Sequence, residues 1–361
     1  MCAMKTKIKK MIRSVDNRYY TAAIRRAEHL KIRDKKDLWM QVRLTREQIR
    51  EIQRIWGEHA DTRWHRYYQY FTGKFDPRYV PEIFYSCNME LVLNPRKMAK
   101  EMEDKARIPI LYGSVPDLKI PKTIVLNASG IFYDGEGNVL SKTAASALVK
   151  EYLENHSNAI LKPTRETNSG KGVVLLDKKH FDDFTPGENY IIQEQIVNQE
   201  DIRRLNPDSL NTMRIMTYIC KNRYWCAPVV LRIGNGTGHL DNAHSGGVFI
   251  GVGREGELQP YAFSEYGNKY QRHPHSGLVF HKYKLSGVDS AVRAAIACHK
   301  RNPHMRMVSW DLTIDREGSP VLIEANLTNQ SVWIPQIAHG EGVFGDHTED
   351  MLEECRNMAQ R

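Results

Sequence analysis

The 361-residue sequence has no run of about 18 apolar residues, which excludes a membrane-spanning helix of ordinary length. Its first residues, Met1 to Arg13, are basic but lack the apolar stretch of a secretory signal. The six cysteines are scattered and form no CxxC pair, so we expect free thiols in a reducing cytosol, without a disulfide framework or a zinc site. Internal repeats and low-complexity tracts are also absent. These absences indicate a cytoplasmic globular protein.

Positive charge is plentiful, and it is unevenly distributed. Lys and Arg number 52 against 43 Asp and Glu, and the whole excess of +9 lies in residues 1–104, because residues 105–361 hold equal numbers of both signs. We expect this segment to bind an acidic partner or a membrane surface, so a peripheral membrane association stays open. Aromatic residues from Trp64 to Phe71 lie among these basic residues, and such a surface could instead bind single-stranded nucleic acid. We favour packing between helices for these rings and expect no nucleic acid.

Two regions are expected. Residues 1–104 read as mostly helical, since Thr45 and Gln48 resemble a capping box and Ile49, Ile52 and Trp56 recur at helical spacing. Residues 105–361 alternate strands and helices, which predicts an α+β catalytic region. The expected helices are Ser141–Asn155, with Ser141 as N-cap, and Ser290–His299; the expected strands are Thr123–Leu126, Ala159–Lys162, Val173–Leu176, Tyr190–Gln193, Met213–Ile219, Val229–Ile233, Met307–Ile314 and Val321–Glu324.

The strongest motif is a predicted hairpin near the end of the chain, formed by Met307–Ile314 and Val321–Glu324. In an extended strand residues two apart share a face, so Glu324 and Asn326 point the same way, and the hairpin brings Asp311 near them. Two carboxylates and an amide oxygen are hard ligands that suit Mg²⁺ and suit zinc poorly. The motif predicts a magnesium site; a solvated hairpin end is the alternative.

A second motif combines lysines with small residues. Lys162 ends an apolar strand, and the loop after it contains Ser169, Gly170, Lys171 and Gly172. Glycines let backbone N–H groups approach phosphate oxygens, and lysines supply positive charge. The GxxxxGK[ST] pattern of a Walker loop is absent. On its own, this motif fits a phosphate-binding loop and a surface hairpin equally well.

Taken in order, these motifs resemble the ATP-grasp fold and, more narrowly, the sugar-transfer-associated ATP-grasp family. The resemblance covers roughly residues 85–345 and rests on Asp104-Lys105, Lys162-Pro163, Leu205–Arg214, His244–Gly247, His273–Gly277 and Trp310–Asn326. It implies two α+β subdomains that clasp ATP, with a lid-like subdomain at about residues 140–196.

The resemblance also implies roles for individual residues. ATP and one or two Mg²⁺ ions would be bound, with Asp311, Glu324 and Asn326 holding the metal. Nucleotide contacts would come from Lys105, Lys162, the Ser169–Gly172 loop, the adenine-facing Glu194 and Ile196, and Glu200 at the ribose. Arg214 and Arg232 would face the transferred phosphoryl group, unless they only form a strand-end ion pair. His244, His273 and His275 are candidates for a general base, and we select His244.

The function implied is a Mg²⁺- and ATP-dependent ligase that joins a small-molecule carboxylate to an amine through an acyl phosphate, releasing ADP and phosphate. A sugar acid or amino acid linked to polysaccharide biosynthesis is the expected substrate class, and a glycan or peptide is one option for the acceptor. Two alternatives stay open: an ATP-grasp kinase acting on a hydroxyl, and an anionic-polymer-binding protein with a degenerate nucleotide site. Specificity is expected from the loops Gly234–Gly251 and Ser264–Leu278.

Overall fold

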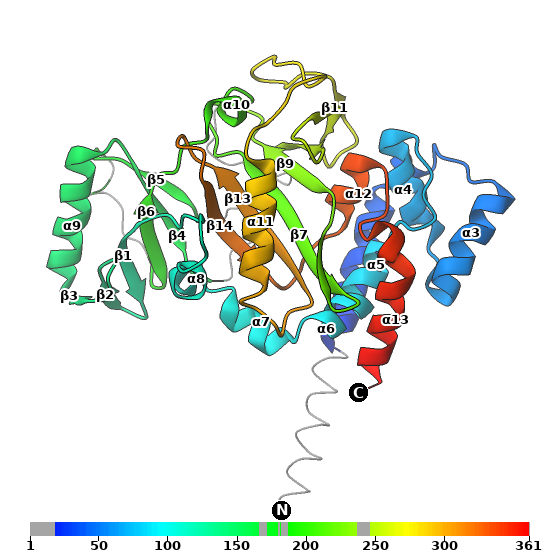
Figure 1. Ribbon diagram of the computed structural model, residues 1–361, viewed down its shortest axis with the longest axis horizontal. Coiled ribbons are helices and arrows are strands. Elements are labelled where there is room, and N and C mark those ends of the chain that lie inside the picture. The colour runs from blue at the N-terminus through cyan, green and yellow to red at the C-terminus, as the bar shows by residue number, and fades with distance from the viewer. Residues whose placement is uncertain (1–18, 166–171, 180, 182–186, 237–245, 361) are drawn as a thin grey trace, which may run out of the picture. The chain divides into compact units, whose positions relative to one another are not determined.

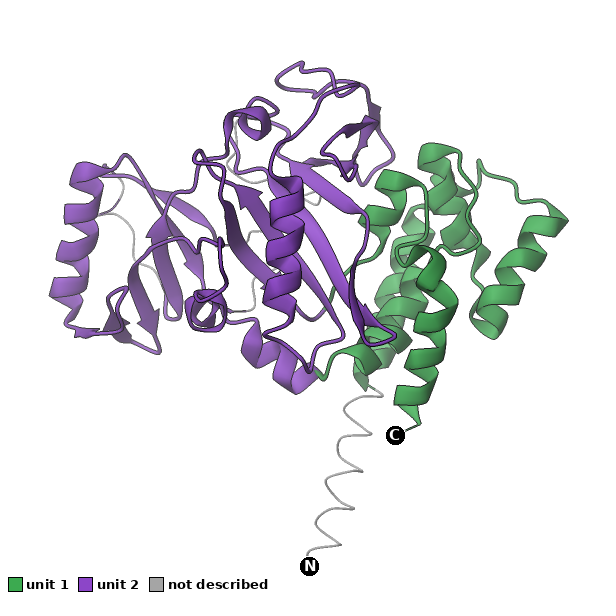
Figure 2. Ribbon diagram, viewed as in Figure 1, with its two compact units in different colours: residues 1–95, 329–361 green, residues 96–328 purple. Residues whose placement is uncertain are grey.

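The computed structural model describes residues 19–165, 172–179, 181, 187–236 and 246–360, and it divides the chain into two compact units. The first unit holds the residues up to 95 together with 329–361, and the second holds residues 96–328 (Figure 2). The sequence predicts a boundary after residue 104, whereas the compact units divide after residue 95. The helical unit ends at residue 95, and the last 33 residues group with it and not with the strand-rich region. This unit is formed by two segments that are far apart in the sequence. The distribution of charge along the chain, on which the predicted boundary rests, gives no information about such a pairing.

The first unit is helical. Helix α3 begins as the sequence predicts, because Thr45 and Gln48 form a complete capping box, and the structure adds Asp61 as the cap of α4. The helical segments are residues 19–34, α2 (Lys36–Trp39), α3 (Arg46–Trp56), η1 (Gly57–His59), α4 (Thr62–Thr72), α5 (Glu82–Phe84), the π-helical η2 (Tyr85–Met89), α6 (Glu90–Leu93), α12 (Trp333–His339), η5 (Gly345–His347) and α13 (Thr348–Ala359) (Figure 1).

Aromatic side chains of α4 form the centre of this unit. Trp64, Tyr67, Tyr68 and Phe71 are all buried, and their rings contact one another at centroid separations of 5.3–6.2 Å. Outside α4, these aromatics are covered by α2, α12 and Tyr79, which agrees with the interpretation that they pack helices together. They are enclosed within the unit and do not form a surface for stacking nucleic-acid bases.

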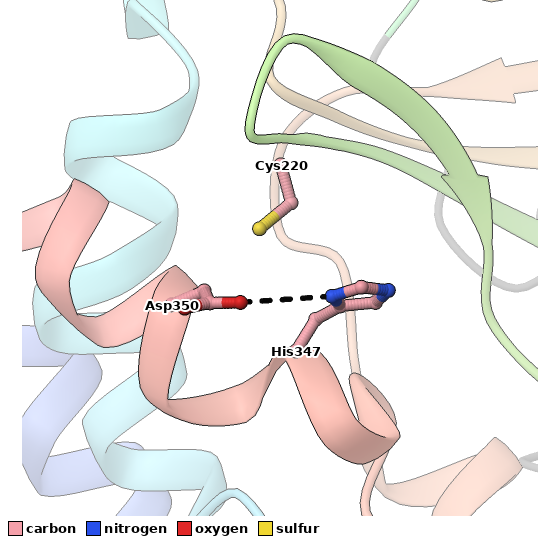
Figure 3. Close-up of side chains that lie close together, drawn as sticks. All are labelled: Cys220, His347 and Asp350. Atoms are coloured by element: carbon pink, nitrogen blue, oxygen red, sulfur yellow. Dashed lines mark ion pairs between the residues drawn. The ribbon is translucent and has the colours of Figure 1, made fainter.

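Buried polar side chains join the two parts of the chain within the first unit. The Gln336 amide in α12 accepts a bond from the Val80 N–H (2.7 Å) and donates to the Val80 carbonyl (3.1 Å). Asp76 accepts a bond from the Gly342 N–H (2.9 Å). At the start of α13, His347 Nδ1 lies 3.8 Å from an Asp350 carboxylate oxygen (Figure 3). The bonds of Gln336 and Asp76 connect residues 329–361 to the earlier part of this unit.

The buried carboxyl of Glu82 makes the stability of the first unit dependent on pH. Burial, reinforced by the charge of Glu28 and opposed by Lys31, raises the pKa of Glu82 to about 8. The folded protein then binds more protons than the unfolded chain between the ordinary glutamate pKa and 8, so stability falls as pH rises through this window. We expect Glu82→Gln to reduce this pH-dependent loss of unfolding free energy by at least about 1 kcal/mol, since one pKa unit corresponds to 1.36 kcal/mol.

Thermal unfolding of wild type and Glu82→Gln at pH 5 and pH 8.5 measures this effect. Glu353→Gln, the same change at an exposed position of α13, is the control and should keep the wild-type pH dependence. An unchanged dependence in Glu82→Gln would show that other groups are responsible.

The second unit contains two antiparallel sheets. Before the first sheet come α7 (Arg96–Met102), η3 (Lys105–Arg107) and α8 (Ile108–Tyr112). The first sheet has six strands in the order β3-β2-β1-β6-β4-β5, with α9 (Lys142–Asn155) packed on it. Its strands are β1 (Thr123–Ala128), β2 (Ile131–Tyr133), β3 (Val139–Leu140), β4 (Ala159–Pro163), β5 (Val174–Leu176) and β6 (Tyr190–Glu194). Ser141 caps α9 as predicted. Strands β4, β5 and β6 of the predicted lid-like subdomain, at about residues 140–196, share their sheet with β1–β3.

The second sheet has the order β12-β11-β10-β9-β7-β13-β14, and β8 pairs with β7 at one side. Its strands are β7 (Thr212–Cys220), β8 (Arg223–Cys226), β9 (Val229–Ile233), β10 (Val248–Val252), β11 (Leu258–Phe263), β12 (Lys269–Tyr270), β13 (Met307–Ile314) and β14 (Pro320–Asn326), and its helices are α10 (Glu200–Arg203) and α11 (Val288–His299). Cys220, labelled in Figure 3, is the last residue of β7. Strand β12 falls within the segment Ser264–Leu278, and β10 overlaps the segment Gly234–Gly251, both of which are expected to be specificity loops.

Helix α11 covers one face of the second sheet (Figure 1). That face is apolar and includes Ile215, Trp310 and Leu312, which are fully buried. The few polar groups there are paired: the Trp310 indole and His299 both bond to the Thr217 hydroxyl, at 2.8 Å each. Because side chains alternate along a strand, the residues between these point to the opposite face, which is polar.

Among the described residues, none of the helices is both long and apolar enough to cross a bilayer.

Candidate functional site

Strand register places five predicted residues on the face of the second sheet opposite α11. Arg214 of β7 pairs with Asp311 of β13, which pairs with Glu324 of β14. Asn326 lies two residues beyond Glu324, and Arg232 of β9 lies opposite Thr212, two residues before Arg214. Residues directly opposite in antiparallel strands share a face, as do residues two apart in one strand. The four strands therefore present these side chains together.

Asp311 is the centre of this group. Its side chain is 5% exposed, and both carboxylate oxygens accept bonds from Arg214, at 2.6 Å from Nε and 3.2 Å from Nη2. Arg232 adds a bond from Nη2 at 3.2 Å. Burial alone would raise the pKa of Asp311, but the two arginine charges outweigh it and hold that pKa below its usual value. Asp311 is therefore ionised throughout the neutral range.

The other two predicted metal ligands adjoin Asp311. The Asn326 amide nitrogen lies 3.4 Å from an Asp311 oxygen and 3.3 Å from the Ser309 carbonyl. Glu324 forms an ion pair with Lys105, whose Nζ lies 2.7 Å from the carboxylate. Two carboxylates and one amide thus meet at the end of β14, which is a hard-oxygen donor set appropriate to Mg²⁺.

The two predicted nucleotide lysines lie close to this donor set. Lys105 begins η3 and Lys162 lies on β4, and both are 7% exposed. Burial, together with the charge of Lys105, lowers the pKa of Lys162 to about 8, although Glu324 acts in the opposite direction. The Lys105 N–H also donates to the Thr164 carbonyl just beyond β4 (2.9 Å). The site is therefore a concentrated group of buried cations and anions.

The predicted adenine and ribose residues lie at the end of β6 and beyond it. The Glu194 carboxylate accepts a bond from the Lys122 N–H (2.8 Å), so it fixes the chain at this strand end. Ile196 follows and is half-buried. Glu200 is exposed at the start of α10, where it pairs with Arg203 of the same helix (3.7 Å). In the structure, Glu194 accepts a backbone bond that holds the end of β6, and Glu200 forms an ion pair within α10.

Comparison with known proteins identifies the strand-rich part of the chain. Residues 184–350 match the family described as sugar-transfer associated ATP-grasp. The match covers 167 of the 361 residues. It includes Arg214, Arg232 and the three metal-ligand candidates, whereas Lys105 and Lys162 precede it. The predicted α+β class and the ATP-grasp assignment are confirmed.

Similar solved structures are ligases or synthetases at low identity. The VanG D-Ala:D-Ser ligase from Enterococcus faecalis is 13% identical, with a TM-score of 0.41 over 71% of this chain and 61% of that one. D-alanyl-alanine synthetase A from Vibrio cholerae is 12% identical, with a TM-score of 0.40 over 72% and 66%. D-cycloserine synthetase DcsG is 14% identical, with a TM-score of 0.43 over 74% and 73%. The chain thus spans about three fifths of the VanG ligase. No curated protein matches the chain.

The predicted phosphate loop of the ATP-grasp site is described at one end only. Ser169, Gly170 and Lys171 lie outside the described residues, as does His244. Gly172 has a φ of +77°, and a Cβ there would come within 2.8 Å of the Pro163 ring. Glycine is therefore required at this position, both for the backbone conformation and for the close approach of the chain to the end of β4.

The two candidate histidines within the described residues, His273 and His275, differ in their exposure to solvent. His273 is fully buried, with Nε2 2.7 Å from the Gly234 carbonyl and Nδ1 accepting a bond from the Ser276 N–H (3.2 Å). Burial lowers the pKa of His273, and both ring nitrogens are engaged, so it holds a loop and is unsuited to act as a base. His275 is exposed, and its Nε2 lies 3.3 Å from the Asp208 carboxylate.

A buried polar network around Asn206 and Asn211 lies next to Thr212, which Arg232 contacts. Asn206 donates to the Gly234 carbonyl at the end of β9 (3.0 Å), and Asn211 donates to the Asn206 carbonyl (2.9 Å). Next to Asn211, the Thr212 hydroxyl accepts a bond from Arg232 (2.8 Å). The signal was present in the Leu205–Arg214 motif, whose asparagines are short polar residues directly before an apolar strand.

Proposed function

We propose that this protein is a Mg²⁺- and ATP-dependent carboxylate–amine ligase. The observation that supports the proposal most is the single group formed by Asp311, Glu324, Asn326, Arg214 and Arg232, next to Lys105 and Lys162. Oxygen ligands for a divalent cation there adjoin four basic side chains, which is the charge arrangement that a metal–polyphosphate complex needs. The match of residues 184–350 to an ATP-grasp family agrees with it.

The donor set fits Mg²⁺, and each of its members has a place in the proposal. Asp311, Glu324 and Asn326 would hold the metal, which when bound would neutralise charge on the phosphate oxygens. Lys105 and Lys162 would bind phosphate oxygens together with the Ser169–Gly172 loop. Glu194 and Ile196 would face adenine, and Glu200 would reach the ribose once its exposed side chain leaves Arg203.

The two arginines would orient the reacting groups. In the proposed reaction a substrate carboxylate oxygen attacks the γ-phosphorus while the bond to ADP breaks, which gives an acyl phosphate. The amine then attacks the acyl carbon, phosphate leaves, and the amine loses a proton to a base. Arg214 and Arg232 would stabilise the negative charge that develops on these oxygens. His244 stays our prediction for the base, and His273 is withdrawn as an alternative because of its burial.

Labelled substrate tests the order of these steps. The carboxylate substrate, found by screening sugar acids, amino acids and amines for ADP release, is prepared with ¹⁸O in the carboxylate. We expect turnover to require both carboxylate and amine, and one ¹⁸O atom to appear in the released phosphate. Label that stays in the product, or release of AMP, would contradict the acyl phosphate.

Two other outcomes point to the alternatives. ADP release without an amine, with phosphate retained on an organic product, would indicate a kinase. Absent turnover together with steeply salt-dependent polymer binding would indicate a degenerate nucleotide site. The sugar-acid or amino-acid substrate class in polysaccharide biosynthesis and the glycan or peptide acceptor stay predictions. So do the acidic partner or membrane surface for the basic N-terminal segment and the cytoplasmic location.

A further inference from the structure

Glu103 makes an unusual concentration of hydrogen bonds beside the candidate metal ligands. It lies in the short link between α7 and η3. One carboxylate oxygen accepts bonds from the backbone N–H groups of Leu327 (2.7 Å) and Thr328 (2.6 Å), and both oxygens accept from the Thr328 hydroxyl, at 3.0 and 2.8 Å. A carboxylate that accepts several N–H and O–H bonds holds its partners strongly, because each bond is charge-assisted.

The residues that Glu103 binds follow directly on the donor set. Asn326 is the last residue of β14, and Leu327 and Thr328 are the next two. Strand β14 lies at the edge of its sheet, with β13 as its neighbour in the strand order. The position of Glu324 and Asn326 therefore depends on what holds the chain at this end of β14, and Glu103 holds it there.

The two residues after Glu103 bind the other side of the site. Asp104 caps η3 through the Ala106 N–H (3.0 Å) and pairs with Arg165, at 2.5 Å from Nε. Lys105 bonds to the Thr164 carbonyl through its N–H and to Glu324 through its side chain. Three consecutive residues thus connect the end of β14, which carries the metal ligands, with the end of β4, which carries Lys162.

We propose that Glu103 is a positioning residue that sets the metal-ligating end of β14 against the nucleotide lysines, and so couples metal binding to nucleotide binding. The proposal rests on the proposed nucleotide and metal site. Residues that hold metal ligands in place typically change metal affinity about 10–100-fold when mutated, although they do not touch the metal. Glu103 would hold Glu324 and Asn326 in this indirect way, because it binds the backbone of Leu327 and Thr328.

Full-length Glu103→Gln separates this role from a general structural one. Glutamine retains one oxygen that can accept from both N–H groups, but it loses the negative charge that strengthens these bonds and the second acceptor oxygen for the Thr328 hydroxyl. ADP binding is measured by calorimetry in EDTA and again with saturating Mg²⁺. We expect the ADP affinity in EDTA to stay within about twofold of wild type, while the enhancement by Mg²⁺ falls about 10–100-fold.

Two further variants serve as a matched control and as a milder test. Glu101→Gln makes the same change at an exposed position of α7 and should match wild type in both buffers. Thr328→Val removes only the hydroxyl that both Glu103 oxygens accept from, so we expect a smaller loss of the Mg²⁺ enhancement. If Glu103→Gln fails to fold, as circular dichroism and thermal unfolding would show, Thr328→Val carries the test.

The outcomes distinguish this inference from the proposed function. A wild-type Mg²⁺ enhancement in both Glu103→Gln and Thr328→Val overturns the positioning role. Equal losses in EDTA and in Mg²⁺ also overturn it and assign Glu103 to structure alone. Wild-type protein that binds ADP in neither buffer overturns the proposed function and this inference together.

Discussion

Asparagine in place of Asp311 is expected to lower nucleotide turnover about 10²–10³-fold, the loss that follows removal of one preorganised electrostatic group. Asp311 is buried, accepts bonds from Arg214 and Arg232, and is the central metal-ligand candidate. The substitution removes the negative charge but keeps the volume. Steady-state ADP release measures the effect. Turnover close to wild type would remove Asp311 from the site.

The same substitution should also lower stability, because it removes the buried negative charge to which both Arg214 and Arg232 donate. Breaking a buried ion pair costs about 3–5 kcal/mol. The matched control is Asp289→Asn on α11, where an exposed aspartate pairs with Arg293; exposed pairs contribute about 0–1 kcal/mol. Circular dichroism at the assay temperature separates lost turnover from unfolding. Asparagine is preferred over alanine because alanine would add a cavity beside the two arginines.

Methionine in place of Lys162 is expected to stabilise the protein and to weaken nucleotide binding. Burial and the neighbouring Lys105 lower the pKa of Lys162 from 10.5 to about 8, so keeping Lys162 charged at pH 7 costs about 3 kcal/mol at 1.36 kcal/mol per pKa unit. Lys162→Met removes that cost. It also removes an ammonium from the proposed phosphate site, which should weaken ADP binding about 10–100-fold, the effect of one charged hydrogen bond.

The stability difference between Lys162→Met and wild type should depend on pH. Between pH 8 and 10.5 the unfolded chain keeps a proton on Lys162 that the folded protein has lost, so this residue makes wild type more stable as pH rises. The advantage of Lys162→Met should shrink over the same range. Thermal unfolding at pH 7 and pH 10 measures it, with exposed Lys142→Met on α9 as control. A variant less stable than wild type at pH 7, with unchanged ADP affinity, would contradict the expectation.

Local sequence signals predicted much of the fold. The capping residues Thr45 and Ser141 each fix a helix start, because the bonds they make lie within four residues of one another. Strand β13 runs over the predicted Met307–Ile314, and β14 extends the predicted Val321–Glu324 by one residue before it and two after. Strand β10 was missed although Val248–Val252 is an apolar run typical of a buried strand, whereas β12 has only two residues and is a strand through its pairing with β11.

The sequence by itself determined which residues of the hairpin share a face. Alternation along an extended chain places Glu324 and Asn326 together wherever β14 lies. Only the tertiary structure decided that β7, β9 and β13 align Arg214, Arg232 and Asp311 on that same face, because strand register between distant segments depends on many pairings at once. It likewise decided the lowered pKa of Lys162 and the contacts of Glu103. The charges that act on Lys162 and the groups that Glu103 binds come from segments 57 or more positions away along the chain, a separation across which no local pattern carries information.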